Sequence, residues 1–421
     1  MSAFFLILLL IFVTSITLLA HTYIAYPVLM RWMGRRRPLP GDRFRSGREF
    51  PEVAVLMAVY NEEKVLAETL ASILASDYPP EKLTVFIGSD GSTDRSDAIA
   101  KSFSDADPRV RLVSFGGRNG KIRIINRLAE GALTTFSDPD KAIFVLCDAN
   151  VTWAGSLLRR LVSHFKRESV GLVGAAVVDR IREHTGIGDQ EEAYVGQENL
   201  VKFAEGVIWG RVMGAFGACY AMRSRLFTPV PPHHIVDDFY LTLSCLEQGS
   251  DAIVDLDAVC HEAVSTDIRE EFRRKRRIAA GNFQNLRRFR QYLLPWHGGP
   301  AVAFAFWSHK GLRWYGPFLL VAAMLSALAL GFQNPWFLPG VGGFLALFLM
   351  AAADRILAGR GWGHVRAFRF CRYFLSMNLA LFLGYLDFLR GPRTSVWEPT
   401  RRETAPLTRE TPPRHEPALR K

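Results

Sequence analysis

Polar side chains follow four apolar runs in the first 150 residues of the chain. Each run has the composition of a buried strand, and in a parallel sheet the carboxyl ends of the strands meet at one edge, where ligands bind. Carboxylate oxygens at such an edge accept hydrogen bonds from N–H groups and hydroxyls, and they ligate divalent cations. A single acid there usually caps the next helix, which is the alternative for Asp94. The polar groups are Tyr60, Asn61 and Glu62; Asp90 to Asp94; Gly116 to Lys121; and Asp148 to Asn150.

The elements that position these groups alternate between strands and helices. Strands that alternate with helices form a parallel, doubly wound sheet, because each crossover between parallel strands needs a helix. The chain is therefore expected to contain an α/β domain with a mostly parallel sheet. The predicted strands are residues 53–59, 83–87, 110–115 and 142–146, and the predicted helices are residues 65–74, 94–100 and 122–132.

Two further clusters carry charges that can take part in chemistry. Asp237 and Asp238 precede a helical pattern at residues 239–246. Acids at a helix start ordinarily cap the helix or interact with its dipole, so this structural role is the alternative to a functional one. Arg273 to Arg277 form a basic run, and such a run beside a membrane can bind anionic headgroups.

Composition excludes several classes of protein. The 421 residues suffice for a domain of about 200 to 250 residues and a further part. A hydrophobic content of 49% and a charged content of 22% exclude a disordered chain and a bundle made only of membrane helices. The net charge of +11 suits phosphates, nucleotides or lipid headgroups, and no nucleic-acid-binding motif occurs. Five cysteines without a CxxC pair support neither a zinc site nor a disulfide framework, and His233, His234 and His261 are expected to lie in loops.

Apolar segments near both ends predict membrane helices. Residues 4–20 are almost wholly apolar, and the arginines after them are expected to stay in the cytoplasm, which places the N-terminus outside. A cleaved signal peptide is the alternative. Residues 312–331 and 336–357 predict a helical hairpin in the membrane. Residues 368–389 contain charges, so this segment either spans the membrane or lies in its interface.

The position of the basic tail distinguishes these two possibilities. If all four segments span, the tail lies outside, against the positive-inside rule; if the last segment lies flat, the tail stays inside. The sequence leaves this choice open. The predicted parts are a membrane helix at 1–34, the α/β domain at 48–290, an interfacial helix at 295–311, membrane helices at 312–390 and a disordered tail at 391–421.

Six segments, in order along the chain, resemble those of membrane-integrated family 2 glycosyltransferases. This family includes the synthases of cellulose, hyaluronan and poly-N-acetylglucosamine. The resemblance implies a GT-A fold, a nucleotide-sugar donor and an inverting reaction. The segments are VYNEE (Val59 to Glu63), SDGSTD (Ser89 to Asp94), Gly120 with Lys121, CDAN (Cys147 to Asn150), VDDF (Val236 to Phe239) and RRKRRIAAGN (Arg273 to Asn282).

The resemblance assigns roles around the diphosphate. Sugar transfer requires that charge on the departing diphosphate be neutralised and that a base take the acceptor proton. Asp148 is implied to bind Mg²⁺ or Mn²⁺, with Asn150 as a weaker ligand where the family often has an acid. Lys121 is implied to contact the diphosphate, and a solvated lysine at a helix start is the alternative. Asp238 is implied to be the base, beside Asp237 in the donor site.

The nucleoside and the leaving group have implied contacts of their own. Residues matching Tyr60, Glu62 and Asp90 hold the nucleobase and ribose in the family, and uracil is the usual base. Arg274 and Arg277 match the Gln and Arg of the QxxRW segment, which predicts that they lie in the donor site and that Arg277 binds the diphosphate. Ile278 stands where the family has tryptophan, which weakens the case for a processive synthase.

The leading hypothesis is an inverting transferase at the cytoplasmic face of the inner membrane. It would move a sugar from a nucleotide donor, UDP-linked by resemblance, to a glycan or lipid-linked acceptor during synthesis of a surface glycan. One rival donates to a polyprenyl phosphate. A second rival is a non-catalytic nucleotide-binding membrane protein, which Asn150 and Ile278 favour. A protein partner or a homo-oligomer is conceivable because the membrane segments are few for a channel.

Overall fold

The computed structural model describes residues 2–39, 44, 49–179, 187–262, 267–360 and 365–391. Contacts divide this part of the chain into two compact units. An α/β unit lies within residues 30–179 and 192–262, and a helical unit comprises residues 2–29, 187–191, 267–360 and 365–391. The contacts therefore place residues 267–290 with the membrane segments rather than with the α/β unit. The predicted tail at 391–421 lies outside the described residues apart from Gly391.

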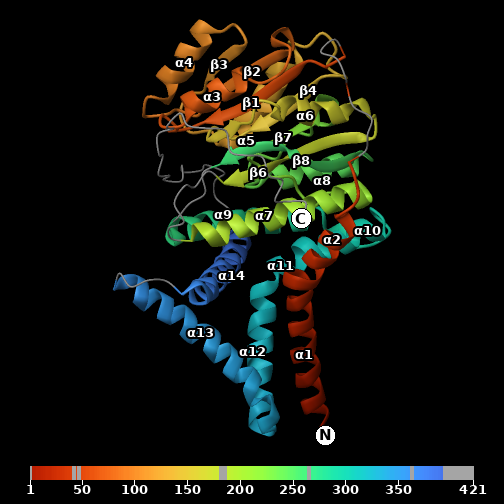
Figure 1. The fold of residues 1–421 in the computed structure, drawn as a ribbon, viewed down its shortest axis with the longest axis vertical. Coiled ribbons are helices and arrows are strands. Elements are labelled where there is room, and N and C mark those ends of the chain that lie inside the picture. The colour runs from red at the N-terminus through yellow and green to blue at the C-terminus, as the bar shows by residue number, and fades with distance from the viewer. Residues whose placement is uncertain are drawn as a thin grey trace. The chain divides into compact units, whose positions relative to one another are not determined.

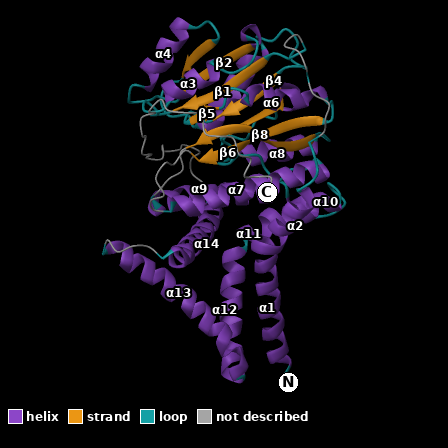
Figure 2. Ribbon diagram, viewed as in Figure 1, coloured by secondary structure: helices purple, strands orange, loops and turns teal. Residues whose placement is uncertain are grey.

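An eight-stranded sheet forms the α/β unit, in the order β3-β2-β1-β4-β7-β6-β8-β5 (Figure 2). The first four strands run parallel, as the apolar runs predicted, and helices connect them. The predicted fold class is therefore confirmed. The strands are β1 (Val53–Val59), β2 (Leu83–Ser89), β3 (Val110–Ser114) and β4 (Ile143–Cys147), and the helices are α3 (Leu66–Leu74), α4 (Ser96–Ala106) and α5 (Lys121–Leu133).

The other half of the sheet is mixed, and the sequence patterns did not predict its strands. Strand β7 runs antiparallel to both β4 and β6, β5 runs antiparallel to β8, and β6 and β8 are parallel. His261 lies in β8, so its expected place in a loop was wrong. The strands are β5 (Val151–Trp153), β6 (Val170–Asp179), β7 (Cys219–Arg223) and β8 (Asp251–Glu262), and the helices are α6 (Leu157–Ser163), α7 (Gly188–Trp209) and α8 (Asp237–Glu247).

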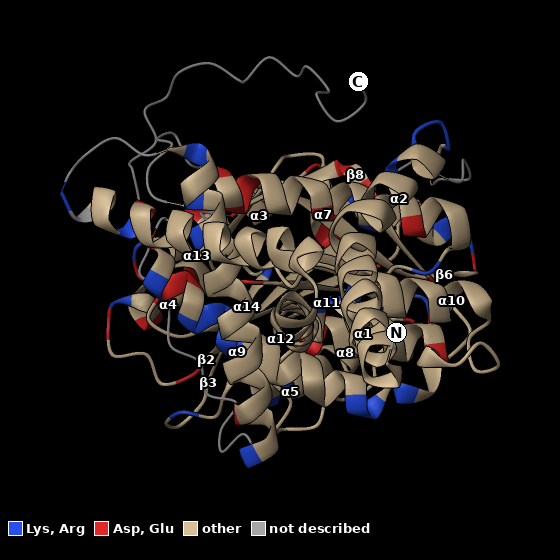
Figure 3. Cartoon of the chain, turned by 90° about the horizontal axis from the view of Figure 1, so that it is seen from below, with Lys and Arg blue, Asp and Glu red and all other residues tan. Residues whose placement is uncertain are grey.

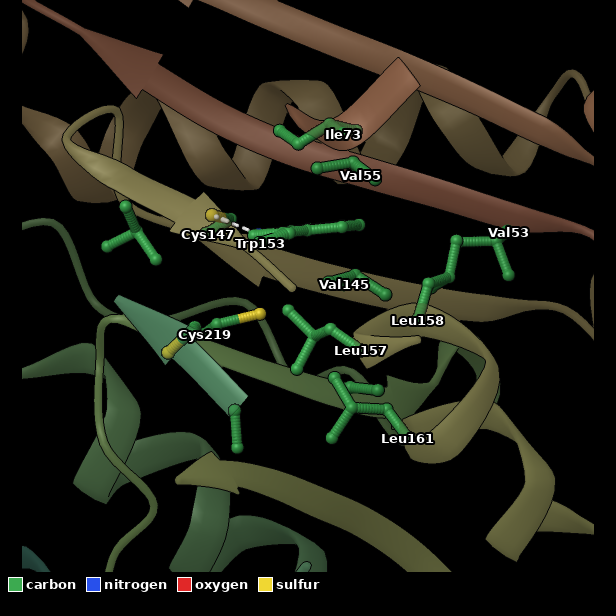
Figure 4. Packing of buried hydrophobic residues seen from close by; sticks show 14 of the residues in the cluster. Val53, Val55, Ile73, Val145, Cys147, Trp153, Leu157, Leu158, Leu161 and Cys219 are labelled. Atoms are coloured by element: carbon green, nitrogen blue, oxygen red, sulfur yellow. Dashed lines mark hydrogen bonds between the residues drawn. The ribbon is translucent and has the colours of Figure 1, made fainter. Parts of the chain in front are cut away.

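Helices cover both faces of the parallel strands. Alternate residues of β1 from Val53 to Val59 pack with α3 and α6 in one apolar core (Figure 4). The indole Nε1 of Trp153 donates to Cys147 Sγ across 3.2 Å, so the core continues to the end of β4. On the opposite face, a Cβ at Gly88 would lie 2.2 Å from Ile124 Cγ2, so α5 packs directly on β2. This packing fixes the strand ends that carry the candidate site.

Among the described residues, three helical segments are long and apolar enough to cross a membrane, and all were predicted. Figure 3 shows α1 and α12 end-on and without charged residues. The N-terminal segment is α1 (Ala3–Ala20), a π-helical turn (His21–Ala25) and α2 (Tyr26–Gly34). The hairpin consists of α12 (Gly316–Gln333) and α13 (Leu338–Gly359) (Figure 1). The candidate spans are Ala3–Gly34, Gly316–Gln333 and Pro335–Ala358.

Helix α14 (Arg366–Arg390) differs from these three in its polar contacts. It contains the segment for which spanning and interfacial positions were both open, and it is not among the candidate spans found in the described residues. It packs along α9 (Ile268–Arg288), where Arg276 donates two hydrogen bonds of 2.6 and 2.8 Å to Asp387. Residues 295–311, predicted as an interfacial helix, contain α10 (Pro300–Ala305) followed by a π-helical turn.

Candidate active site

A tight turn at the end of β4 carries Asp148 and Asn150. The Val151 N–H donates to the Asp148 carbonyl at 3.3 Å, which closes the turn between β4 and β5. The Asp148 N–H donates to the Ala218 carbonyl at 3.1 Å, which fixes the turn against the strand beside β4. Two side chains separated by one residue are thereby presented from the carboxyl end of β4, where the sequence predicted a ligand site.

Lys121 links this turn to the acid pair of α8. Gly120 precedes α5 with a φ of 89°, a conformation that favours glycine, and Lys121 is the first residue of the helix. The Lys121 ammonium lies 2.8 Å from Asp148 Oδ1 and 3.4 Å from Asp237 Oδ2. Burial alone would lower the pKa of Lys121, but the charges of Asp148, Asp237 and Asp238 outweigh it and raise the pKa. Lys121 therefore stays protonated.

Asp238 lies in the first turn of α8 beside Asp237, and its carboxylate is held in place. Its Oδ1 accepts from the Phe239 N–H at 2.6 Å, and a Cβ at Gly217 would approach its Oδ2 to 3.0 Å. Burial, and then the charge of Asp237, raise the pKa of Asp238 to about 6, against the opposing charges of Lys202 and Lys121. A carboxylate with a pKa near 6 is suited to accept a proton at neutral pH.

Two residues beside this acid pair were not found from the sequence. Lys202 of α7 is buried, with its ammonium 3.4 Å from the centre of the Phe216 ring, and its charge lowers the pKa of Asp238. Tyr220 of β7 is also buried. Burial, followed by the charges of Asp237, Asp238 and Asp148, raises the pKa of Tyr220. Neither belongs to a recognisable motif, so only the fold brings them to the site.

The loop after β3 is held by Asp90 at the end of β2. The buried Asp90 carboxylate accepts from the backbone N–H groups of Asn119 and Gly120, and Arg118 Nε lies 3.3 Å from its Oδ2. The Arg118 guanidinium in turn stacks 3.2 Å above the centre of the Tyr60 ring. Asp90 thus sets the shape of the loop, while the contact of Asp90 and Tyr60 with a nucleoside stays a prediction.

The segment after β1 is tied to the segment after β2 by short polar contacts. Asn61 has a φ of 53° and accepts from the Thr93 N–H at 2.8 Å, while the Glu62 N–H donates to Ser96 Oγ at 2.7 Å. Asp94 accepts from the Ser96 N–H at 2.9 Å and from the Glu63 N–H at 3.1 Å, so it joins the segment after β1 to the start of α4, whose N-cap is Arg95. Glu62 is half-buried, and its contact with a nucleoside stays a prediction.

Asn150 has a carboxylate neighbour that the motif did not reveal. Its amide Nδ2 donates to Glu262 Oε1 at 3.2 Å, and Glu262 is the last residue of β8. The pairing of β5 with β8 places Glu262 opposite Val151, the residue after Asn150. The antiparallel register therefore brings a carboxylate from the far half of the sheet to the turn that carries Asp148.

The donor set suits a cation held jointly with a ligand. Asp148 and Asp237 already hold an ammonium group between them, so their carboxylates face a common point. Among the described residues no group of three or more His, Cys, Asp or Glu side chains is placed to hold a metal alone. Mg²⁺ typically takes only one or two carboxylates and completes its shell with waters and phosphate oxygens, and these residues fit that pattern.

Arg274 and Arg277 lie on α9, in the helical unit. Arg274 Nε donates to Glu271 Oε2 at 2.9 Å, and its guanidinium reaches 3.3 Å from the buried Glu191. Burial would raise the pKa of Glu271, but Arg274 and Lys275 lower it to about 2. Arg277 is exposed on the same helix. Arg274 is thus part of a buried ion cluster within its unit, and the diphosphate contacts of both arginines stay predictions.

The fold and the sequence together define a class. Residues 54–227 match glycosyl transferase family 2, and residues 143–353, half of the 421 residues, match glycosyl transferase family group 2. The chain belongs to the family 2 glycosyltransferases and is an enzyme of that class. Its α/β unit has the GT-A fold. The chain resembles the structure of the mannosyltransferase PcManGT from Pyrobaculum calidifontis, solved with GDP-Man and Mn²⁺. The TM-score is 0.65 and the sequence identity is 22%, and the match covers 90% of this chain and 99% of that one.

Two curated relatives from bacteria have the names of different glycosyltransferases. A beta-monoglucosyldiacylglycerol synthase from Synechocystis sp. is 27% identical over 328 residues, 70% of this chain. The chain spans 64% of the length of that relative. An N-acetylglucosaminyltransferase from Mesorhizobium japonicum is 24% identical over 398 residues, 88% of this chain and 86% of its own length.

Proposed function

We propose that this enzyme is an inverting glycosyltransferase that moves a sugar from a nucleoside diphosphate donor to an acceptor hydroxyl at the cytoplasmic face of a membrane. The observation that carries the proposal is the gathering of Asp148, Asp237 and Lys121 around one point, with Asp238 beside them at a pKa of about 6. Direct displacement by one base-activated hydroxyl inverts the anomeric centre, so an α-linked donor gives a β-linked product.

One group of residues acts on the diphosphate, and Asp238 acts on the acceptor. A divalent cation, when bound, would neutralise charge on the departing diphosphate. Asp148 and Asn150 would hold that cation, and Lys121 supplies a second positive charge beside them. Asp238 takes the proton of the attacking hydroxyl, since burial and the charge of Asp237 raise its pKa to about 6 against the opposing charges of Lys202 and Lys121. The loop that Asp90 holds would accept the nucleoside, with uracil as the predicted base.

The acceptor is proposed to be a lipid or a lipid-linked glycan. Ile278 in place of tryptophan argues against a processive polymer synthase, because it provides no aromatic platform for an acceptor sugar. One named relative is a synthase of a glycolipid, beta-monoglucosyldiacylglycerol, which supports a lipid acceptor. Addition to a single acceptor is expected rather than synthesis of a long polymer.

The membrane segments support a cytoplasmic location in the inner membrane. If the N-terminus lies outside, the three candidate spans in the described residues would leave both the α/β unit and the chain after α14 in the cytoplasm, as the positive-inside rule favours. Helix α14 then lies in the interface, since its Asp387 and Arg372 form ion pairs with α9 and α13. This arrangement removes the conflict that four spans would create.

A donor screen tests the proposal. Purified full-length protein in nanodiscs that contain diacylglycerol and polyprenyl phosphate is mixed with UDP- or GDP-sugars, with and without Mn²⁺ or Mg²⁺. Release of the nucleotide is measured and the product is analysed by mass spectrometry. We expect release with one donor, dependence on a metal and a glycosylated hydroxyl. A product linked through phosphate would establish the polyprenyl-phosphate rival, and nucleotide binding without turnover on any donor would establish the non-catalytic one.

A further inference from the structure

The hydrogen bond between Asn150 and Glu262 is the feature that the proposed reaction leaves unused. The Asn150 side chain is 8% exposed, and it donates through Nδ2 to Glu262 Oε1 at 3.2 Å. Glu262 ends β8 and comes from a segment more than 100 residues further along the chain than Asn150. Nothing in the turn itself requires an acid at that place, since the Asp148–Val151 hydrogen bond already closes the turn.

A carboxylate in this position controls which way the amide faces. An amide side chain carries its oxygen and its NH₂ group on opposite sides, and only the oxygen can ligate a cation. A carboxylate accepts hydrogen bonds but donates none when ionised, so it selects the NH₂ side of Asn150 and directs Oδ1 away from itself. The bond is charge-assisted, which makes it stronger than an amide–amide contact.

We propose that Glu262 is a positioning residue for the cation site: it holds the Asn150 amide so that Oδ1 serves as the second protein oxygen beside Asp148. This inference rests on the proposed function, because it presupposes a divalent cation at Asp148. Partners that hydrogen-bond to metal ligands in this way typically change metal affinity by about 10- to 100-fold. Glu262 itself need not touch the cation.

The same contact gives a physical reason for asparagine at position 150. A carboxylate there would lie at hydrogen-bond distance from the carboxylate of Glu262. Two carboxylates so close cannot both stay ionised without a cation between them. Asparagine next to Glu262 keeps one negative charge, whereas an aspartate next to a glutamine would keep the same charge with the hydrogen bond reversed. The pair is therefore expected to behave as one unit.

A thermodynamic cycle on Mn²⁺ binding tests the proposal. Mn²⁺ is titrated into the purified full-length protein with saturating UDP or GDP and no sugar, and free Mn²⁺ is measured by electron paramagnetic resonance. We expect Glu262→Ala to weaken Mn²⁺ binding about 10-fold or more, and Glu262→Gln, which can also donate to Asn150 Oδ1 and so no longer selects the NH₂ side, to weaken it as well. Asn150→Ala should lose as much as Glu262→Ala, and the double alanine variant should bind no more weakly than Asn150→Ala.

Two results would overturn the positioning role. These are wild-type Mn²⁺ affinity in Glu262→Ala and losses that multiply in the double variant, since a residue acting through Asn150 can produce neither. The matched control is Asp257→Ala, which removes a charge from the same strand; Asp257 pairs with Arg160 at 3.3 Å on the surface. This control should bind Mn²⁺ as wild type does.

A charge-conserving exchange covers the case in which Glu262→Ala fails to fold. Asn150→Asp combined with Glu262→Gln should bind Mn²⁺ at least as tightly as wild type, and a loss of about 10-fold or more would contradict the proposal. Failure of the two proposals can be told apart. Sugar transfer by a wild-type protein that binds no Mn²⁺ would overturn the positioning role alone. An intact binding cycle without turnover on any donor would overturn the proposed function alone.

Discussion

The two halves of the sheet contribute different chemistry to one site. The parallel half, β1 to β4, ends in Asp90, the loop that Asp90 holds, and Asp148. The mixed half, β5 to β8, brings the groups that surround Asp238 and the carboxylate of Glu262. On the proposed function, the first half binds the donor and the second half activates the acceptor through Asp238, while Asp148 and Glu262 both act on the cation. Variants in the loop that Asp90 holds should therefore change binding, and variants around Asp238 should change turnover.

A large effect is expected from Asp148→Ala, at the junction of the halves. The substitution removes the proposed cation ligand and leaves the half-buried Lys121 without its nearest partner. We expect turnover to fall by about 10³-fold, because the transition state loses several kcal/mol of charge stabilisation on the diphosphate. Mn²⁺ binding should fall with it. Turnover within tenfold of wild type at saturating Mn²⁺ would show that the cation is held elsewhere.

A smaller effect, confined to binding, is expected from Asp90→Asn. The carboxylate accepts from Gly120 N–H and pairs with Arg118, so its loss should destabilise the loop by about 1–3 kcal/mol. The dissociation constant of the nucleotide, measured by calorimetry, should rise about 10-fold or more while turnover at saturating donor changes little. The control is Asp105→Asn, which changes an exposed side chain of α4. A fall in turnover at saturating donor with unchanged nucleotide affinity would contradict the assignment of Asp90 to nucleotide binding.

The pH dependence of turnover probes the second half. Asp238 must be deprotonated to act as a base, so kcat/KM should fall as the pH drops through about 6. Lys202→Met removes a positive charge that lowers the pKa of Asp238, so the acid limb should move to higher pH. Lys202→Arg should restore the wild-type profile. An unchanged limb in Lys202→Met would mean that another group sets it. Lys141→Met, on the surface, is the control.

The smallest effect is expected from Tyr220→Phe. Within the part of the chain that the structure describes, the buried Tyr220 hydroxyl has no hydrogen-bond partner, so its removal leaves no other group unsatisfied. Thermal unfolding should show a change in stability of less than about 0.5 kcal/mol, or a slight gain. A loss of more than about 1.5 kcal/mol would reveal a hydrogen bond to the acid pair.

The sequence predicted the parallel half better than the mixed half for a physical reason. Strand β1 was predicted at residues 53–59, as observed, because a buried parallel strand is a continuous apolar run with polar residues after it. Strand β6 is also an apolar run that ends at Asp179, so its pattern resembles that of β1, whereas β8 carries Asp251, Asp255, Asp257 and Glu262 within one strand. Their place in the sheet depends on long-range pairing, which no local pattern encodes.

The same limit applies to the site. Asp148 and Asp238 were identified because each belongs to a short motif, but the sequence placed Lys121 at the diphosphate and did not predict its ion pairs with Asp148 and Asp237. Lys202 and Glu262 reach the site from α7 and the end of β8. No spacing in the sequence links them to Asp238 or Asn150. Only the crossing of α7 and the register of β5 with β8 make them neighbours.

The most direct test of the central claim is the turnover of Asp238→Asn, measured as nucleotide release with the acceptor present and compared with donor affinity for the same protein. Asparagine keeps the size of the side chain and its acceptor for the Phe239 N–H, but it cannot take the acceptor proton. The account predicts a fall in turnover of about 10²- to 10⁴-fold with donor affinity within threefold of wild type. Wild-type turnover in this variant would contradict it.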